Sequence, residues 1–357
     1  MIQVPEPARD MDAGGDGSEP GSASGQPPAQ EWRRAVAAIE SLPAGARILL
    51  VCHVNPDPDA LGSMLGFGLG LRRLGRSGIE ASFPGPLEVP DSLDRLPGLE
   101  FLVASTAVGA DPDLVISFDA GNLQRLGELG SVLVRAPVSL VLDHHASNTR
   151  FGQINLVDPA AAATSVLVDG LLHRLGVPLD AELAECLYVA LATDTGSFKF
   201  DATTVAVHEF AARLVATGIP VAEISRRLFD TRPYGAVRLF GEVLCRAELE
   251  PPAAGGLGLV WTYATLADLA HHGQRPQVLE ALIDSVRCVQ EVDVACVVKQ
   301  VRPDEWAVSL RSKGGVDVSR VAVALGGGGH RLAAGFTGYG SLAEVVAGLR
   351  KRLDDPG

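Results

Sequence analysis

The chain has 357 residues, of which 47% are hydrophobic and 20% charged, and its formal net charge is −13. This composition is typical of a globular protein with enough apolar side chains for two domains, and it excludes a wholly disordered chain. The acidic balance argues against long duplex nucleic acid as a partner, because such binding requires a broad basic face. It leaves room for small anionic ligands held by local cations or metal ions.

The sequence shows no sign of a membrane or secreted protein. No apolar run approaches the roughly 18 residues that a membrane-spanning helix requires. The five cysteines form no CxxC pair, and the N-terminus lacks the basic and apolar regions of a secretion signal. We therefore expect a cytoplasmic protein that has reduced thiols and no membrane contact.

The first predicted domain follows an acidic tail. Residues 1–30 contain 13 Gly, Pro or Ser and five acids against one Arg, which predicts a disordered segment. Residues 31–200 then begin with a helical pattern and continue with alternating strands and helices. The strands are expected at 46–53, 79–83, 113–119 and 138–143, with a helix at 59–74. This alternation predicts an α/β domain with a mostly parallel sheet flanked by helices.

A second, smaller α/β domain is predicted at 247–357, after a helical linker at 201–246. The linker pattern predicts helices at 203–216, 220–230 and 233–246, and a Pro/Gly-rich break follows at 250–258. Three strands of a mixed sheet are expected beyond it, at 257–263, 292–301 and 305–312. The helices of this domain are expected at 276–289, 317–324 and 341–353.

Acidic and histidine side chains follow three of the strands in the first domain and end one helical stretch. They are His53, Asp57 and Asp59, then Asp119, then Asp143, His144 and His145, and finally Asp194. A single Asp after a strand is usually a helix cap, but capping does not explain the same chemistry at four separate ends. The carboxyl ends of parallel strands are where such sheets bind ligands. We therefore expect these side chains to gather at one edge of the sheet.

Carboxylates gathered in this way repel one another unless cations neutralise them. Oxygen and imidazole ligands without thiolates suit two Mn²⁺ ions, with Mg²⁺ as the alternative. Pro56 and Pro58 flank Asp57 and restrict the backbone, so that Asp57 and Asp59 can point toward different ions. Two adjacent ions that share a bridging carboxylate are suited to phosphoryl hydrolysis.

The order HxxxDxD, Asp, DHH, Asp across residues 53–194 resembles the DHH phosphoesterase superfamily. Residues 310–336, LRSKGGVDVSRVAVALGGGGHRLAAGF, resemble the DHH-associated second domain of that superfamily. The resemblance is to the branch that degrades very short oligoribonucleotides and dephosphorylates 3′-phosphoadenosine 5′-phosphate, and some relatives also cleave cyclic dinucleotides. By resemblance, His53 and Asp57 bind one metal, Asp59, His144 and Asp194 bind the other, and Asp119 bridges them.

The resemblance also implies roles beyond the metals. His145 faces the substrate phosphate as an electrostatic stabiliser or general acid, and Asp143 orients a metal-binding histidine. The glycine run 326–329 by itself predicts a tight turn entering a short helix, where successive N–H groups can bind an anion. With the resemblance, the substrate-binding residues are Arg311, Ser312, Gly328, Gly329 and His330. Arg125 is either a solvated helix residue or a phosphate contact.

These patterns predict a metal-dependent phosphoesterase that hydrolyses very short oligoribonucleotides to mononucleotides, 3′-phosphoadenosine 5′-phosphate to AMP, or both. Cyclic and linear dinucleotides are further candidates, and we expect a homodimer. One alternative is a nucleotide-binding regulatory module without catalysis, but such a module would be expected to lack some of the ligands. The other is a general single-strand exonuclease, which would normally need a longer chain with a further nucleic-acid-binding domain. The sequence does not rank the substrates.

Overall fold

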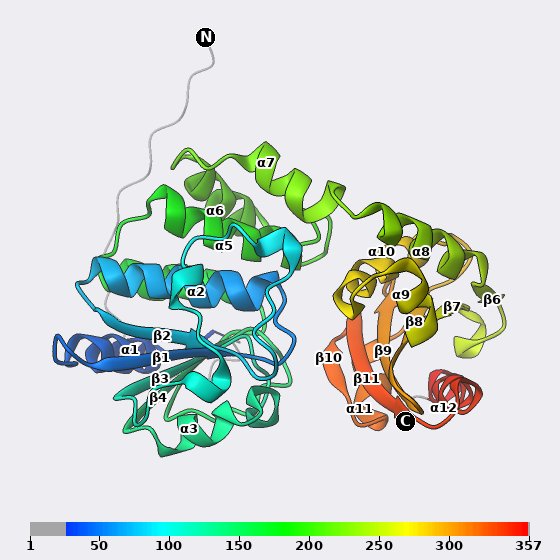
Figure 1. The fold of residues 1–357 in the computed structure, drawn as a ribbon, viewed down its shortest axis with the longest axis horizontal. Coiled ribbons are helices and arrows are strands. Elements are labelled where there is room, and N and C mark those ends of the chain that lie inside the picture. The colour runs from blue at the N-terminus through cyan, green and yellow to red at the C-terminus, as the bar shows by residue number, and fades with distance from the viewer. Residues whose placement is uncertain (1–25, 356–357) are drawn as a thin grey trace, which may run out of the picture.

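The computed structural model describes residues 26–355, so most of the predicted tail lies outside the described residues. The chain forms two α/β halves, which lie side by side in Figure 1. Among the described residues, no helix is long and apolar enough to cross a lipid bilayer. The α/β architecture with two sheets confirms the predicted fold class.

The first half contains a five-stranded parallel sheet with the order β2-β1-β3-β4-β5. Its strands are β1 (Arg47–Cys52), β2 (Gly78–Ser82), β3 (Leu114–Phe118), β4 (Val138–Asp143) and β5 (Ile154–Val157). Its helices are α1 (Ala29–Glu40), α2 (Pro58–Arg73), α3 (Leu129–Arg135), α4 (Thr164–Arg174), α5 (Ala181–Asp194), α6 (Val205–Val215) and α7 (Val221–Ser225). Short helical turns are η1 (Asp91–Leu93), η2 (Leu99–Phe101), η3 (Ser105–Ala107), η4 (Leu123–Leu126) and η5 (Arg226–Asp230), the last of them a π-turn.

Side chains alternate along β1 between two apolar layers. Leu50 and Cys52 pack in the layer of α2 and α5, and Leu49 and Val51 pack on the opposite side with α3 (Figure 1). Helix α2 lies close against α5: a Cβ atom on Gly62 would come within 2.5 Å of the Cys186 carbonyl oxygen, so a larger residue does not fit there. A sheet covered on both faces in this way leaves its strand ends free to carry a site.

The register of the sheet brings the predicted site residues to one edge. Cys52 pairs with Phe118, and Phe118 pairs with Leu142, so β1, β3 and β4 end at nearly the same level. His53 and Asp119 directly follow β1 and β3, and Asp143 is the last residue of β4. The expected gathering of acids and histidines at the carboxyl edge therefore follows directly from strand pairing.

The second half contains a mixed six-stranded sheet with the order β10-β11-β9-β8-β7-β6, in which β7 and β8 are the parallel pair. Its strands are β6 (Glu248–Glu250), β7 (Leu259–Ala264), β8 (Val294–Arg302), β9 (Glu305–Ser312), β10 (Gly328–His330) and β11 (Ala333–Tyr339). Its helices are α8 (Tyr234–Cys245), α9 (Leu266–His272), α10 (Leu282–Val286), α11 (Val318–Ala324) and α12 (Leu342–Asp354), with turns η6 (Ala254–Gly256) and η7 (Pro276–Ala281).

Two predicted elements differ from the structure. The glycine run does not enter a helix: it follows the end of α11, and its second half forms edge strand β10, which pairs with β11. The helix predicted at 276–289 is a 3₁₀ turn followed by the short helix α10.

The segment 201–246, which we expected to be a linker, packs in two parts. Phe210 and Leu214 of α6 belong to the core of the first half, as does Ile224 of α7. Leu239 and Phe240 of α8 pack instead on the second sheet. The chain thus passes between the halves near residues 231–233, where the elements α7 and η5 give way to α8.

Candidate active site

The first group of site residues lies in the turn between β1 and α2. His53 Nε2 is 3.7 Å from Asp57 Oδ2 and 3.6 Å from Asp119 Oδ2. His53 Nδ1 lies 2.8 Å from the Val54 carbonyl oxygen, and this contact turns Nε2 toward the carboxylates. Asp57 also caps α2, because its Oδ1 accepts a hydrogen bond from Ala60 N. The cap uses one oxygen and leaves the other to face His53.

The second group joins the ends of β4 and α5. His144 Nε2 is 3.1 Å from Asp194 Oδ2, 3.7 Å from Asp59 Oδ2 and 3.5 Å from Asp119 Oδ1. His144 Nδ1 lies 3.1 Å from the Ala161 carbonyl oxygen, so this histidine too directs Nε2 at carboxylates. Asp59 is fully buried.

Asp119 lies between the two groups, with Oδ2 toward His53 and Oδ1 toward His144. Its backbone φ is +54°, in the left-handed region that costs a non-glycine residue free energy. Strain of this kind persists where the surrounding structure requires it, which is common at functional sites. One buried carboxylate therefore faces both groups with different oxygens.

The electrostatics of this cluster are those of crowded anions. Burial, and then the charge of Asp119, raise the pKa of Asp59 well above its ordinary value. Although burial disfavours the charged imidazolium, the nearby carboxylates of Asp119 and Asp57 raise the pKa of His53 to about 10. Within residues 26–355, no Lys or Arg forms an ion pair with Asp57, Asp59, Asp119 or Asp194. Four carboxylates with imidazole nitrogens and no fixed cation are a donor set that fits divalent metal ions.

Asp143 has a different partner from the one we expected. Its Oδ1 is 2.7 Å from His145 Nδ1, and its Oδ2 accepts a hydrogen bond from Asn148 Nδ2. His144, the histidine of the second group, is oriented by a backbone carbonyl instead. The expectation is therefore corrected: Asp143 orients His145 and leaves its Nε2 free.

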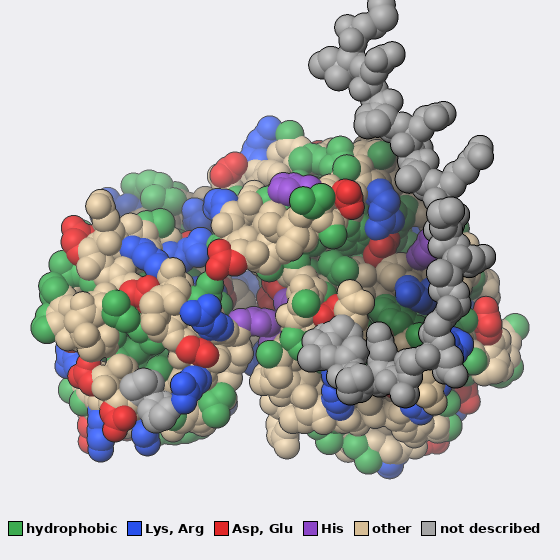
Figure 2. Space-filling model, turned by 180° about the vertical axis from the view of Figure 1, so that it is seen from behind, with side chains coloured by type: hydrophobic (Ala, Val, Ile, Leu, Met, Phe, Trp, Pro, Cys, Tyr) green, Lys and Arg blue, Asp and Glu red, His purple; other side chains and the backbone are tan. Residues whose placement is uncertain are grey.

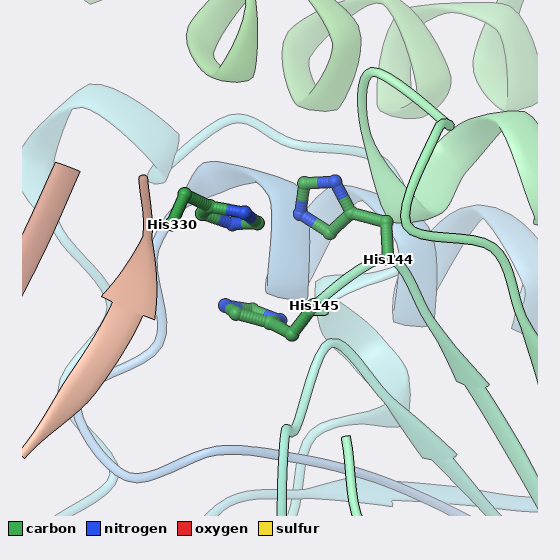
Figure 3. Close-up of side chains that lie close together, drawn as sticks. All are labelled: His144, His145 and His330. Atoms are coloured by element: carbon green, nitrogen blue, oxygen red, sulfur yellow. The ribbon is translucent and has the colours of Figure 1, made fainter. Parts of the chain in front are cut away.

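The second half of the chain reaches this centre through His330. Figure 3 shows its ring, on β10, directed toward His144 and His145. The centroid of the His330 ring lies 4.7 Å from that of His145, and the two rings are stacked. It lies 4.9 Å from the centroid of the His144 ring. Gly329 has φ +137°, and a Cβ atom there would lie 2.6 Å from the Ala333 carbonyl oxygen. Glycine thus lets β10 lie against β11 and carry His330 to the centre.

The other predicted substrate-binding residues of the second half differ in their contacts. Arg311, on β9, is half-buried; its Nη1 donates to the Leu310 carbonyl oxygen, and no carboxylate of the described chain lies within ion-pair distance. Burial lowers the pKa of this guanidinium. The Ser312 hydroxyl donates to Asp293 Oδ2 and accepts from Gly314 N, so it anchors a loop. Gly328 pairs with Gly335 across β10 and β11.

Arg125 lies beside the first group. Its Nη2 is 2.9 Å from His53 Nδ1, and its backbone oxygen accepts from Val54 N. The residue therefore packs on the metal side of the site, although much of its side chain is exposed.

Three residues that the sequence analysis did not single out contact the site carboxylates. Their side chains donate hydrogen bonds: Ser63 to Asp59, Thr164 to Asp119 and Asn148 to Asp143. Only Ser63 carried a local signal, since it lies four residues after Asp59 on α2 and hence on the same helix face.

Known proteins agree with this architecture. The model of the DHH family, N-terminal domain, matches residues 47–191, and that of the DHHA1 domain matches residues 260–355. The bifunctional oligoribonuclease and PAP phosphatase NrnA of Thermus thermophilus is 34% identical over 323 residues, which cover 87% of this chain and 91% of the relative. Its namesake from Bacillus subtilis is 28% identical over 303 residues, with coverage of 82% and 89%.

A solved structure, an exopolyphosphatase-related protein from Bacteroides fragilis, shares the fold with a TM-score of 0.80 at 24% identity. The match covers 91% of this chain and 96% of that one. With both domain matches and the extended similarity to NrnA proteins, the chain belongs to the DHH family of metal-dependent phosphoesterases, on the NrnA branch.

Proposed function

We propose that this phosphoesterase hydrolyses very short oligoribonucleotides to mononucleotides and 3′-phosphoadenosine 5′-phosphate to AMP. The observation that carries the proposal is the position of His330, which brings the second half of the chain onto His145 beside the carboxylate cluster. The substrate phosphate then lies between the halves. The names of the NrnA relatives support the substrate class.

Two metal ions fit the donor set. His53 and Asp57 would hold one ion, Asp59, His144 and Asp194 the other, and Asp119 would contribute an oxygen to each. We expect Mn²⁺, with Mg²⁺ as the alternative. When bound, such ions supply Lewis-acid polarisation of the phosphoryl group and activation of water.

We assign the proton transfer to His145. Hydrolysis breaks the bond between phosphorus and the leaving ribose oxygen, and that oxygen must take up a proton. His145 keeps Nε2 free for this, because Asp143 holds Nδ1. Asp143 is fully buried and tied to Asn148, so the imidazole has a fixed orientation.

The site is open to a short anion. Figure 2 shows the surface hollowed between the two halves, with a histidine side chain at the rim. Arg311 supplies a cation without a carboxylate partner, and with Gly328, Gly329 and His330 it belongs to the half that would hold the terminal nucleotide. Ser312 would support this surface through its loop, and Arg125, beside His53, would contact a substrate phosphate.

A substrate panel tests the proposal. With Mn²⁺ present, the panel compares a ribodinucleotide, a pentamer, a roughly 25-residue single strand, 3′-phosphoadenosine 5′-phosphate, a cyclic dinucleotide and pyrophosphate. We expect kcat/KM to be highest for two to about five nucleotides and for the nucleotide monoester, because the net charge of −13 repels an extended polyanion beyond the site. Equal or rising efficiency for the long strand would favour the general exonuclease instead. Absence of all turnover would favour a regulatory module. The homodimer and the cytoplasmic location remain predictions.

A further inference from the structure

The first turn of α4 contacts the carboxylate cluster through Thr164. This residue is fully buried. Its backbone N–H donates to Asp59 Oδ2 at 2.7 Å, and its hydroxyl donates to Asp119 Oδ1 at 3.0 Å. Thr164 therefore touches two site carboxylates from different elements, Asp59 in the first turn of α2 and Asp119 directly after β3.

The hydroxyl is not used to cap the helix, as would be usual for a threonine at a helix start. Ala163 occupies the N-cap position and offers no side-chain acceptor. The Asp59 carboxylate serves as the cap acceptor instead. Its Oδ2 accepts from Thr164 N, and its Oδ1 accepts from Ser165 N at 3.3 Å. The hydroxyl is thereby left for Asp119. Because a carboxylate only accepts, the hydroxyl proton must point to Asp119.

We propose that Thr164 is a positioning residue that fixes Asp59 and Asp119 relative to each other and so shapes the second metal group, that of Asp59, His144 and Asp194. The inference rests on the proposed metal centre and names a residue outside its ligand set. Asp119 Oδ1 is the oxygen that faces His144, so the hydroxyl holds the oxygen that this group shares. The hydrogen bond from Thr164 goes to Oδ1, whereas Oδ2 is the oxygen that faces His53.

The chemistry explains why threonine suits this position. A hydrogen bond from a buried hydroxyl to an ionised carboxylate is charge-assisted and fixes the plane of the carboxylate. The hydroxyl is held at this carboxylate by its own hydrogen bond to Asp119 Oδ1. Partners of this kind change metal affinity by about 10- to 100-fold when they are removed.

The test is a titration of the full chain, stripped of metal with EDTA, with Mn²⁺ alone. Thr164→Val keeps the shape and the backbone N–H but removes the hydroxyl, and Thr164→Ser keeps the hydroxyl. We expect two ions to bind to the wild type and to Thr164→Ser. In Thr164→Val we expect one of the two to bind about 10- to 100-fold more weakly while the other is unchanged. Thr262→Val removes an equally buried hydroxyl from β7 and should bind as the wild type does.

Circular dichroism establishes that each variant is folded, and Thr164→Ala takes the place of Thr164→Val if the latter is not. The proposal is overturned if the hydroxyl-free variant binds both ions with wild-type affinity, or if Thr164→Ser loses as much affinity as Thr164→Val. A wild type that binds no Mn²⁺ would instead refute the proposed metal centre, so the two failures are distinguishable.

Discussion

Replacing Asp119 by Asn should disable both metal groups at once. The substitution keeps the shape of the side chain but removes its charge and one of its two acceptor oxygens. In the structure these oxygens lie 3.6 Å from His53 Nε2 and 3.5 Å from His144 Nε2. Asp57 faces only the first of these histidines, so Asp57→Asn should weaken one group and spare the other.

The size of the effect can be read from thermal stability. A ligand that binds only the folded state adds about 2.7 kcal/mol at 100 times its Kd, so two ions add roughly 5 kcal/mol. Each kcal/mol shifts Tm by about 2–4 °C in a unit of 150–250 residues. Between EDTA and saturating Mn²⁺ the first half should therefore gain about 10–20 °C in the wild type, about half of that in Asp57→Asn, and almost nothing in Asp119→Asn.

Differential scanning calorimetry with metal analysis of each sample measures this. Asp201→Asn serves as the control, since it removes the same charge from an exposed position shortly after Asp194 and should keep the full shift. Asp119→Asn that retains two ions and the wild-type shift would refute the bridging role. A shift half that of the wild type would mean that Asp119 serves a single group.

His145→Ala should retain its metal ions but lose about 10²- to 10⁴-fold in kcat, as measured by turnover and metal content, because we propose its Nε2 as the proton donor. Loss of metal would show instead that His145 is a ligand. Arg311→Ala should reduce kcat/KM most for dinucleotides, because the shortest substrates depend most on this contact for their orientation. An equal loss of kcat/KM at every length in a series of oligoribonucleotides would contradict this expectation. Burial raises the pKa of Asp268, but hydrogen bonds from Arg246 and Thr265 lower it more. Ionised Asp268 therefore stabilises the folded state at pH values above 3.8, the ordinary pKa of Asp, and this contribution is lost as the pH falls through its lower pKa in the folded state. Asp268→Asn should remove this loss, so the free energy of unfolding of the second half should fall less steeply at acid pH.

The meeting of the acidic and histidine side chains at one edge of the sheet could be predicted, because they lie at or just after the ends of parallel strands. Once β1, β3 and β4 are parallel neighbours, the residues after them must meet, whatever their exact register. The partner of Asp143 could also be predicted from the sequence. Side chains alternate along an extended chain, so Asp143 and His145, two residues apart, share a side, while His144 faces the other way.

Other features depend on contacts that no local pattern encodes. Strand β10 consists of Gly328, Gly329 and His330, and glycine has a low strand propensity, so only pairing with β11 makes this segment a strand. Thr164 reaches Asp59 and Asp119 across 105 and 45 residues of sequence. Its segment predicts no more than a helix start, because the carboxylates that take its hydrogen bonds are brought to it by the tertiary fold.

The acidity of the chain and its substrate length can be understood together. Without metal ions, the buried carboxylates around Asp119 would repel any phosphate, and the net charge of −13 adds to that repulsion. Two bound divalent ions would neutralise the four carboxylates, and Arg311 adds one cation from the other half of the chain. Solvent screens this attraction over about 8 Å at physiological ionic strength. Phosphates farther along a strand therefore gain little from the centre and meet a predominantly acidic protein, so each added nucleotide contributes less binding free energy than the first. Substrate binding must then depend on metal occupancy, and by thermodynamic reciprocity a short substrate should tighten the binding of the ions.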